Sequence, residues 1–109
     1  MKLYIGGAYQ GQEELARREN PGCVLWTDFH MTVRRAVLSD GKDPAAFAEG
    51  FVRDNPDAVV VADEVGSGVV PLQAEDRRFR EAVGCVLCVI ARESEQVTRC
   101  VCGIGVRIK

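Results

Sequence analysis

Apolar stretches alternate with amphipathic stretches along the chain, and this order predicts an α/β fold. Apolar runs predict strands at residues 2–5, 23–27 and 59–62, and an alternating pattern predicts strand structure within residues 96–109. Apolar positions at helical spacing predict helices at residues 13–19, 31–38, 44–53 and 73–91. Strands joined through helices form right-handed βαβ units. We therefore expect a small, mostly parallel sheet of four or five strands flanked by helices.

Local signals support these helix boundaries. Asp43 is expected to cap the helix at residues 44–53, because Pro44 then occupies its first position. The sequence Asn20-Pro21-Gly22 ends the first helix and turns the chain. A chain of 109 residues has the length of one domain, so residues 1–109 are expected to form a single shortened domain.

The first predicted strand runs directly into a glycine-containing segment, Gly6-Gly7-Ala8-Tyr9-Gln10-Gly11-Gln12-Glu13, which a helix follows. This is the setting of a phosphate-binding P-loop, in which backbone N–H groups and a helix N-terminus surround a phosphate. The P-loop pattern is G-x-x-x-x-G-K-[ST]. Gly6 and Gly11 keep the glycine frame, while Gln12 occupies the lysine position and Glu13 the hydroxyl position.

These two replacements reverse the charge expected of a P-loop. Loss of an ammonium about 4 Å from a phosphate removes an attraction on the order of a few kcal/mol at an effective dielectric near 20. Glu13 adds a negative charge where phosphates would lie. Phosphoryl transfer depends on positioning and charge stabilisation, so we expect kinase activity to be absent or very weak. The alternative interpretation is a tight strand-to-helix turn that binds nothing.

Two acids follow the third predicted strand. Residues 59–62 are apolar, and Asp63 and Glu64 come directly after them, before the flexible Gly66-Ser67-Gly68. Open α/β sheets bind their ligands outside the carboxyl ends of the strands. We therefore expect both carboxylates to contribute to a site at that edge of the sheet.

The same region carries a resemblance to a known family. Residues 63–71 read D-E-V-G-S-G-V-V-P, residues 77–81 read R-R-F-R-E, and Gly84 follows. This resembles the N-E-V-G-x-G-[IV]-V-P and R-R-F-R-[DE]-x-x-G segments of the adenosylcobinamide kinase / adenosylcobinamide-phosphate guanylyltransferase family of cobalamin biosynthesis. The family's P-loop is close to GGARSGKS, and its closing segment resembles residues 103–109. About a dozen positions agree in order and spacing, which is specific where one short motif would not be.

The resemblance implies a truncated P-loop NTPase-like fold of the RecA type and a site for GTP or ATP with Mg²⁺, together with a corrinoid substrate. Asp28 ends the second predicted strand, where the resemblance implies a carboxylate that holds Mg²⁺ through water; a solvated helix cap is the alternative. The candidate catalytic residues are Asp28 and Glu64. The candidate nucleotide-binding residues are Gly6 to Glu13, Asp63, and the helix arginines Arg77, Arg78 and Arg80, which a solvated helix face also explains.

The chain also departs from the family pattern. The enzymes that it resembles carry several dozen additional residues between the first helix and the second strand, including an H-R-x-x-R-P segment whose histidine accepts the guanylyl group. Only Asn20-Pro21-Gly22 stands there. His30 is the sole histidine, and its neighbours lack the arginines of that segment, so a packing or surface role is expected. Loss of the block would uncover apolar surface, so we expect a homo-oligomer.

Five cysteines offer a different chemistry. Cys85 and Cys88 share a face of the last predicted helix, and Cys100 and Cys102 share a face of the last predicted strand. Four thiols that converged could hold zinc or form a redox pair. Against this, residues 85–88 lie in an apolar run without the turn glycines of zinc knuckles, and cysteine is often simply buried. No metal ligand is therefore assigned.

Charge and hydropathy limit the partners. The formal net charge is −2, whereas binding to a phosphate backbone usually needs a basic excess, so nucleic acid is not expected. The longest apolar stretch, residues 83–91, is too short to span a bilayer, and residues 1–7 do not read as a signal peptide. We expect a cytoplasmic protein with reduced thiols.

Three functions are compatible with the sequence. The first is a nucleotide-dependent kinase of the resembled family acting in corrinoid metabolism, with weak or lost activity. The second is a non-catalytic relative that binds a nucleotide or corrinoid in regulation or assembly, and Gln12 and Glu13 favour it. The third is the zinc or redox module.

Overall fold

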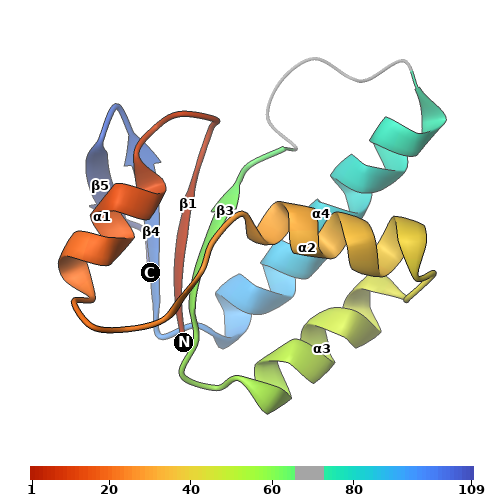
Figure 1. Ribbon diagram of the computed structural model, residues 1–109, viewed down its shortest axis with the longest axis horizontal. Helices are drawn as coiled ribbons and strands as arrows, with labels where there is room; N and C mark the ends of the chain where they lie inside the picture. The colour runs from red at the N-terminus through yellow and green to blue at the C-terminus, as the bar shows by residue number, and fades with distance from the viewer. Residues whose placement is uncertain (66–72) are drawn as a thin grey trace.

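The structure, a computed structural model, describes residues 1–65 and 73–109. It contains one sheet of five strands in the order β2-β3-β1-β4-β5 (Figure 1). Strands β1 to β4 are parallel, and β5 is antiparallel to β4. The strands are β1 (Lys2–Gly6), β2 (Leu25–Trp26), β3 (Val59–Asp63), β4 (Gln96–Val101) and β5 (Ile104–Arg107). The predicted α/β fold with a mostly parallel sheet is confirmed, and it is compatible with a P-loop NTPase-like fold.

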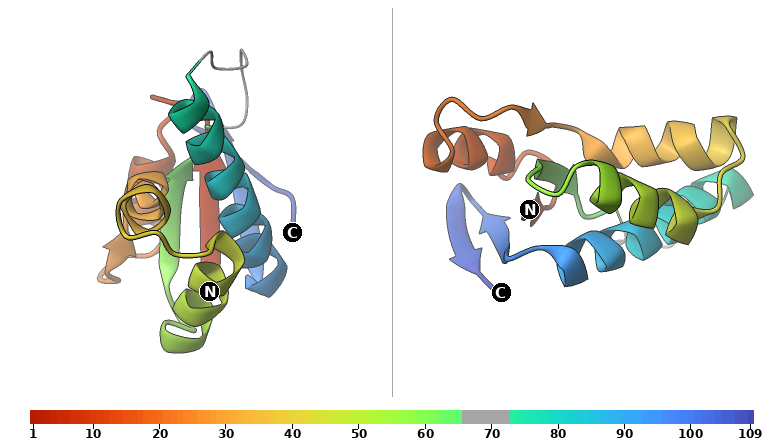
Figure 2. Two further views of the ribbon diagram at one scale, coloured as in Figure 1. Left: turned by 90° about the vertical axis from the view of Figure 1, so that its right-hand side faces the viewer. Right: turned by 90° about the horizontal axis from the view of Figure 1, so that it is seen from below.

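Helices cover both faces of the sheet. Helix α1 packs on one face, against β1 and β3, and α4 packs on the other (Figure 1, Figure 2). Helices α2 and α3 pack on α4 at the side of the sheet where β3 lies. The helices are α1 (Gln12–Glu19), α2 (Phe29–Arg34), α3 (Pro44–Asp54) and α4 (Ala74–Glu93), and a π-helical turn, η1 (Arg35–Ser39), continues α2.

The period-two alternation of strand side chains builds two cores. Leu3, Val60 and Val97 are buried on the face covered by α4. Tyr4, Val61 and Cys100 belong to the core on the opposite face, where α1 supplies Leu15 and Ala16. Because the central strands are covered on both sides, they read as continuous apolar runs in the sequence.

Several boundaries differ from the prediction. The second strand is only Leu25–Trp26, and the helix expected at residues 31–38 begins at Phe29. Residues 96–109 form a hairpin, because Cys102 and Gly103 both have positive φ (51° and 76°) and reverse the chain. The expected cap of α3 is confirmed, since the Asp43 carboxylate accepts a hydrogen bond from the backbone N–H of Ala46 at 3.0 Å.

No helix in the described ranges 1–65 and 73–109 has the length and apolar character needed to cross a bilayer. The Gly66–Pro71 part of the resembling motif lies outside the described residues, while its two acids and the later arginines lie within them.

Candidate functional site

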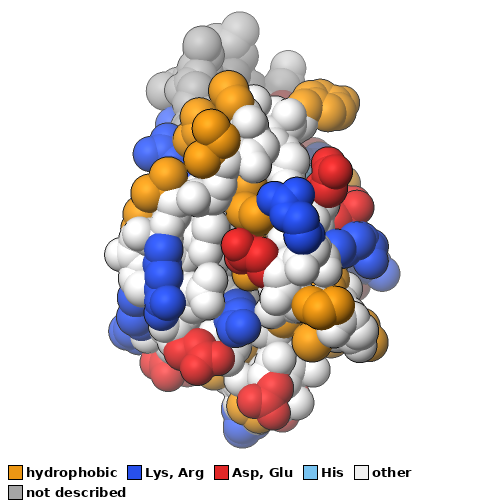
Figure 3. All heavy atoms as spheres, turned by 90° about the vertical axis from the view of Figure 1, so that its left-hand side faces the viewer, with side chains coloured by type: hydrophobic (Ala, Val, Ile, Leu, Met, Phe, Trp, Pro, Cys, Tyr) orange, Lys and Arg blue, Asp and Glu red, His pale blue; other side chains and the backbone are white. Residues whose placement is uncertain are grey.

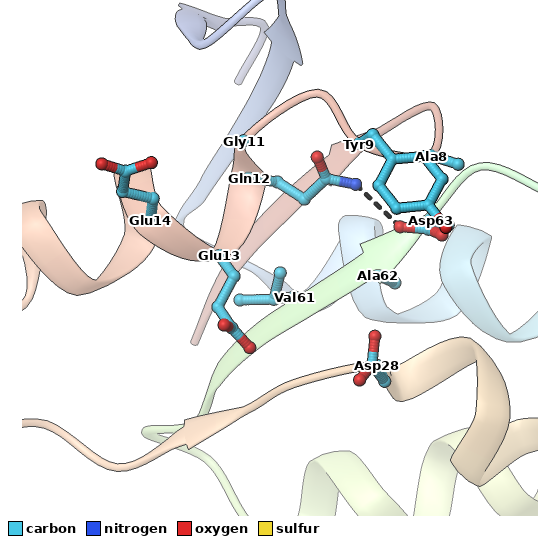
Figure 4. Close-up of a pocket in the computed structure, with 10 residues that line it drawn as sticks. All are labelled: Ala8, Tyr9, Gly11, Gln12, Glu13, Glu14, Asp28, Val61, Ala62 and Asp63. Atoms are coloured by element: carbon cyan, nitrogen blue, oxygen red, sulfur yellow. Dashed lines mark hydrogen bonds between the residues drawn. The ribbon is translucent and has the colours of Figure 1, made fainter.

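The carboxyl ends of β1 and β3 border a cavity of about 490 Å³ (Figure 4). The glycine segment supplies one wall, β3 supplies the floor, and the turn before α2 supplies another side. This is the edge of a parallel sheet where ligands bind in open α/β folds. The lining residues are Ala8, Tyr9, Gly11, Gln12, Glu13, Glu14, Asp28, Val61, Ala62 and Asp63.

The two glycines of the P-loop frame are required by the backbone. A Cβ atom on Gly6 would lie 2.7 Å from the backbone oxygen of Cys100, a distance that side chains do not tolerate. Gly11 has φ of 87°, in the left-handed region that glycine adopts without strain, and it lies against the Cα of Gly103. The frame therefore reflects close packing of the loop against the β4–β5 hairpin.

Hydrogen bonds attach the glycine segment to that hairpin. The Gln10 side-chain oxygen Oε1 accepts a hydrogen bond from the backbone N–H of Cys102 at 2.7 Å. The Gln10 backbone oxygen accepts another from the N–H of Gly103 at 2.8 Å. The turn between β4 and β5 thus holds the tip of the loop in place.

Gln12 fills the space under the loop. Its side chain is buried, with the residue 5% exposed. Its amide nitrogen Nε2 donates to the backbone oxygens of Gly6 at 3.3 Å and Gly7 at 3.1 Å, and to Oδ1 of Asp63 at 2.8 Å. The dashed line in Figure 4 marks the last of these. A neutral amide therefore joins the loop to the end of β3, at the sequence position where a P-loop has its lysine.

His30 completes a chain of contacts through Asp63. The backbone N–H of Asp63 donates to Nδ1 of His30 at 3.1 Å, and Nε2 of His30 lies 3.6 Å from Oδ2 of Asp63. An imidazole whose Nδ1 accepts a hydrogen bond carries its neutral-state proton on Nε2, here facing the carboxylate. Sequence reasoning assigned His30 a packing or surface role and missed this contact.

The turn before α2 explains the position of His30. Asp28, the residue that precedes α2, has φ of 50° and ψ of 41°, a left-handed conformation that Asp tolerates better than most residues. It reverses the chain so that the first turn of α2 faces β3. Asp-x-His spacing alone does not predict such a turn.

Comparison with known proteins shows the family to which the chain belongs. The family model described as "Cobinamide kinase / cobinamide phosphate guanyltransferase" matches residues 5–108. The chain belongs to this family. The resemblance in the sequence is thereby confirmed over nearly the whole chain. A search of curated proteins finds no match. Members of the cobinamide kinase family act in cobalamin biosynthesis, and they bind nucleoside triphosphates and corrinoid substrates.

The pocket of this cobinamide kinase family member is acidic. Four carboxylates, those of Glu13, Glu14, Asp28 and Asp63, are among its lining residues, and no lysine or arginine is among them within the described part of the chain. Figure 4 shows Glu13 and Asp28 on two sides of the space beside Val61. A phosphate chain in this pocket would meet like charges, and it would need a cation to offset them.

Glu64 does not line this pocket. Oε2 of Glu64 lies 3.8 Å from Nε of Arg99, and Glu64 borders a separate cavity of about 320 Å³ between α4 and the sheet. Its backbone N–H donates to the Gly6 oxygen at 2.8 Å. Asp63, the last residue of β3, and Glu64, which follows it, therefore line two different cavities.

The three candidate arginines lie on α4, away from the pocket lining. Arg77 and Arg78 are exposed and Arg80 is half-buried. Arg78 borders a third cavity together with residues 41–45 at the start of α3. The structure therefore brings together the glycine segment, Asp28 and Asp63, and it leaves Glu64 and the arginines elsewhere.

The cysteines do not converge. Cys100 is buried on the face covered by α1, whereas Cys85 and Cys88 are exposed on α4, which covers the opposite face. Cys102 lies in the turn after β4, and it does not share a strand face with Cys100. Within residues 1–65 and 73–109, no group of three or more His, Cys, Asp or Glu side chains is arranged to hold a metal ion. The zinc hypothesis has no geometric support.

Proposed function

We propose that this member of the cobinamide kinase family binds a nucleoside triphosphate weakly in the pocket beside the glycine segment, and transfers its phosphoryl group very slowly or not at all. The observation that carries the proposal is the Gln12 amide, which donates to Gly6, Gly7 and Asp63. A neutral donor that is already engaged by three acceptors has little capacity left for a phosphate oxygen.

Charge supports the same conclusion. Glu13 stands at the position where a P-loop hydroxyl would approach Mg²⁺, and its carboxylate lines the pocket. Phosphoryl transfer relies on cations that neutralise charge developing on the transferred group. A pocket with four carboxylates and no ammonium or guanidinium among its described lining residues offers the opposite environment.

Asp28 and Asp63 are the residues that fit Mg²⁺. Protein sites for Mg²⁺ use one or two carboxylates, with waters and substrate phosphates completing the coordination. Both side chains line the same cavity. A bound Mg²⁺ would supply the positive charge that the pocket lacks, so nucleotide binding is expected to require it.

The guanylyl-transfer half of the family chemistry has no candidate nucleophile. His30 is the only histidine in the chain, and both its ring nitrogens face Asp63, at 3.1 and 3.6 Å from Asp63 atoms. We infer a binding role for the protein in corrinoid metabolism, as a regulatory or assembly component, and we propose that it self-associates through exposed apolar surface.

Two measurements test the proposal. Calorimetric titration with GTP and with ATP, each with and without Mg²⁺, is expected to give weak, Mg²⁺-dependent binding. A kinase assay with adenosylcobinamide is expected to give no phosphorylated corrinoid. Tight binding accompanied by steady product formation would overturn the proposal, and complete absence of binding at millimolar nucleotide would reduce the glycine segment to a structural turn.

A further inference from the structure

The β4–β5 hairpin carries exposed apolar side chains on one face. Val101, Ile104 and Val106 are 46%, 67% and 52% exposed. Val101 pairs with Ile104, and Arg99 with Val106, so these side chains lie on the face of β4 that also carries Val97. Val97 is buried against α4, but the hairpin extends beyond that cover. Figure 3, which faces the side of the molecule with α1 and β5, shows hydrophobic side chains gathered along one margin.

The charged side chains near the edge strand β5 hydrogen-bond to backbone oxygens of their own chain. Nζ of Lys109 donates to the backbone oxygens of Ala91 at 3.1 Å and Arg92 at 2.7 Å, at the C-terminal end of α4. Nε of Arg107 donates to the backbone oxygen of Lys109 at 2.8 Å. Edge strands commonly use exposed lysine to block pairing with another chain. Here β5, the last strand in the sheet order, lacks that protection.

The hairpin turn determines which backbone groups of β5 face outward. Cys102 and Gly103 form a two-residue turn with positive φ at both positions, so the flanking residues Val101 and Ile104 are a hydrogen-bonded pair. Pairs alternate along an antiparallel ladder. Backbone N–H and C=O groups of Gly105 and Arg107 therefore point away from β4, toward the open edge.

We propose that a second copy of this chain pairs its β5 antiparallel to this edge, with Val106 opposite Val106 of the other copy. In this register, outward backbone groups of Gly105 and Arg107 pair with those of Arg107 and Gly105 across the two-fold axis. Ile104 stands opposite Ile108. Each guanidinium-bearing residue then faces a glycine, so no like charges are opposed, and the apolar face continues across the interface.

The interface is small. A short strand with one apolar face buries less than the 1,200–2,000 Å² of a standard interface, so the dimer is expected to be weak and concentration-dependent, with a dissociation constant on the order of micromolar or higher. This interface rests on the self-association proposed above and specifies its surface, and it does not depend on the proposed nucleotide binding. Addition of Mg²⁺ and nucleotide should leave the dimer unchanged, so the failure of nucleotide binding and the failure of this interface can be distinguished.

A matched pair of variants tests the surface by sedimentation velocity over a range of concentrations. Val106→Glu should raise the dimer dissociation constant by about tenfold or more, because two carboxylates would oppose each other across the axis. Within one chain the new carboxylate lies beside Arg99, its partner in the β4–β5 ladder, so the monomer should stay folded by circular dichroism. Val24→Glu is the control, since Val24 is 84% exposed beside β2, at the other edge of the sheet.

Three outcomes would overturn the proposal: a monomer at every concentration, a dimer that Val106→Glu leaves intact, or a dimer that Val24→Glu disrupts instead. The last would assign the contact to the β2 edge. A dimer weakened only by Val106→Glu supports it.

Cross-linking tests the register without relying on a charged variant. The exposed cysteines Cys23, Cys85, Cys88 and Cys102 are first replaced by serine. In that background Val106→Cys should oxidise to a covalent dimer, because opposed residues that are not hydrogen-bonded have Cα atoms about 4.5 Å apart. Ile104→Cys should not, since the two copies of residue 104 would be roughly 13 Å apart. Equal cross-linking of both variants would overturn the register.

Discussion

Nε2 of Gln12 lies 2.8 Å from Oδ1 of Asp63, and this hydrogen bond ties the glycine segment to the end of β3. A lysine at the same position would place a full positive charge beside Asp63 and the loop. The amide provides a shorter, uncharged donor. The glycine segment is thus hydrogen-bonded to the end of β3 by an uncharged side chain of the same chain.

Restoring the P-loop residues should restore nucleotide affinity. The double variant Gln12→Lys with Glu13→Ser adds an ammonium and removes a carboxylate from the pocket. Tighter binding of Mg²⁺–GTP or Mg²⁺–ATP by about tenfold to a hundredfold is expected, equivalent to about 1.4–2.8 kcal/mol. Calorimetric titration measures it. Glu14→Ser, which removes one pocket carboxylate outside the P-loop pattern, is the control and should change affinity much less. Unchanged binding in the double variant would show that the pocket does not receive phosphates.

Removing the acceptor at His30 should destabilise the fold. His30→Leu leaves the backbone N–H of Asp63 without its partner, at a cost of about 1–3 kcal/mol in unfolding free energy. His30→Asn can present an amide oxygen near the position of Nδ1 and should recover part of the loss. Urea denaturation compares the two, with Met31→Leu, at a half-exposed neighbour, expected within about 0.5 kcal/mol of the parent. Equal stability of the Leu and Asn variants would contradict the assignment.

Tyr4 should make stability fall at alkaline pH. Burial, followed by the hydrogen bond that its hydroxyl donates to Glu19, raises the pKa of Tyr4 above 10.0. The folded state therefore keeps the phenol proton that the unfolded state loses. The stabilisation is fully present below pH 10.0 and is lost as pH rises through the folded pKa.

Two variants isolate this effect. Tyr9 is the only other tyrosine, so Tyr9→Phe leaves a phenolate absorbance signal from Tyr4 alone, with an expected midpoint above 10.0. The difference in unfolding free energy between the parent and Tyr4→Phe should be constant below that pH and shrink above it. A Tyr4 midpoint at or below 10.0 would contradict the burial argument.

The five cysteines should divide into two reactivity classes. Cys23, Cys85, Cys88 and Cys102 are exposed, and Cys100 is buried. Burial also raises the pKa of the Cys100 thiol above 9.0, which lowers its thiolate fraction. A thiol reagent should modify four cysteines quickly and Cys100 only after unfolding, as peptide mass mapping can verify. Fast modification of Cys100 in the native protein would mean that its packing against α1 is loose.

The centre of the sheet could be predicted from the sequence because β1 and β3 are covered on both faces and read as apolar runs. The cap at Asp43 and the glycine frame of Gly6 and Gly11 could also be predicted, because each is visible as a short sequence pattern. The hairpin was not separated from a single strand, because its turn rests on Cys102 adopting positive φ, which cysteine seldom does. Strand β2 proved short because only two of its residues pair with β3.

The site was predictable only in part, for a related reason. Asp28 and Asp63 meet in one pocket because Asp63 ends β3 and Asp28 follows the parallel strand β2, and the sequence shows both positions. The sequence did not show that Glu64 lies outside this pocket. A shift of one residue along a strand moves a side chain to the opposite face of the sheet, so the position of Glu64 depends on where β3 ends. The contact between His30 and Asp63 depended on the left-handed turn at Asp28, which is a tertiary outcome.

The hydrogen bond between the Gln10 side chain and the N–H of Cys102 joins residues 92 positions apart. During translation, a ribosome-attached fragment that ends before the hairpin contains the whole glycine segment. It lacks Cys102 and Gly103, whose backbone N–H groups hydrogen-bond to Gln10. Strand β1 likewise cannot complete its pairing until β4 has been synthesised, because β4 is one of its two neighbours in the sheet. The glycine segment is therefore synthesised well before the residues that hold it in place, and its full set of hydrogen bonds can form only after the hairpin has left the exit tunnel.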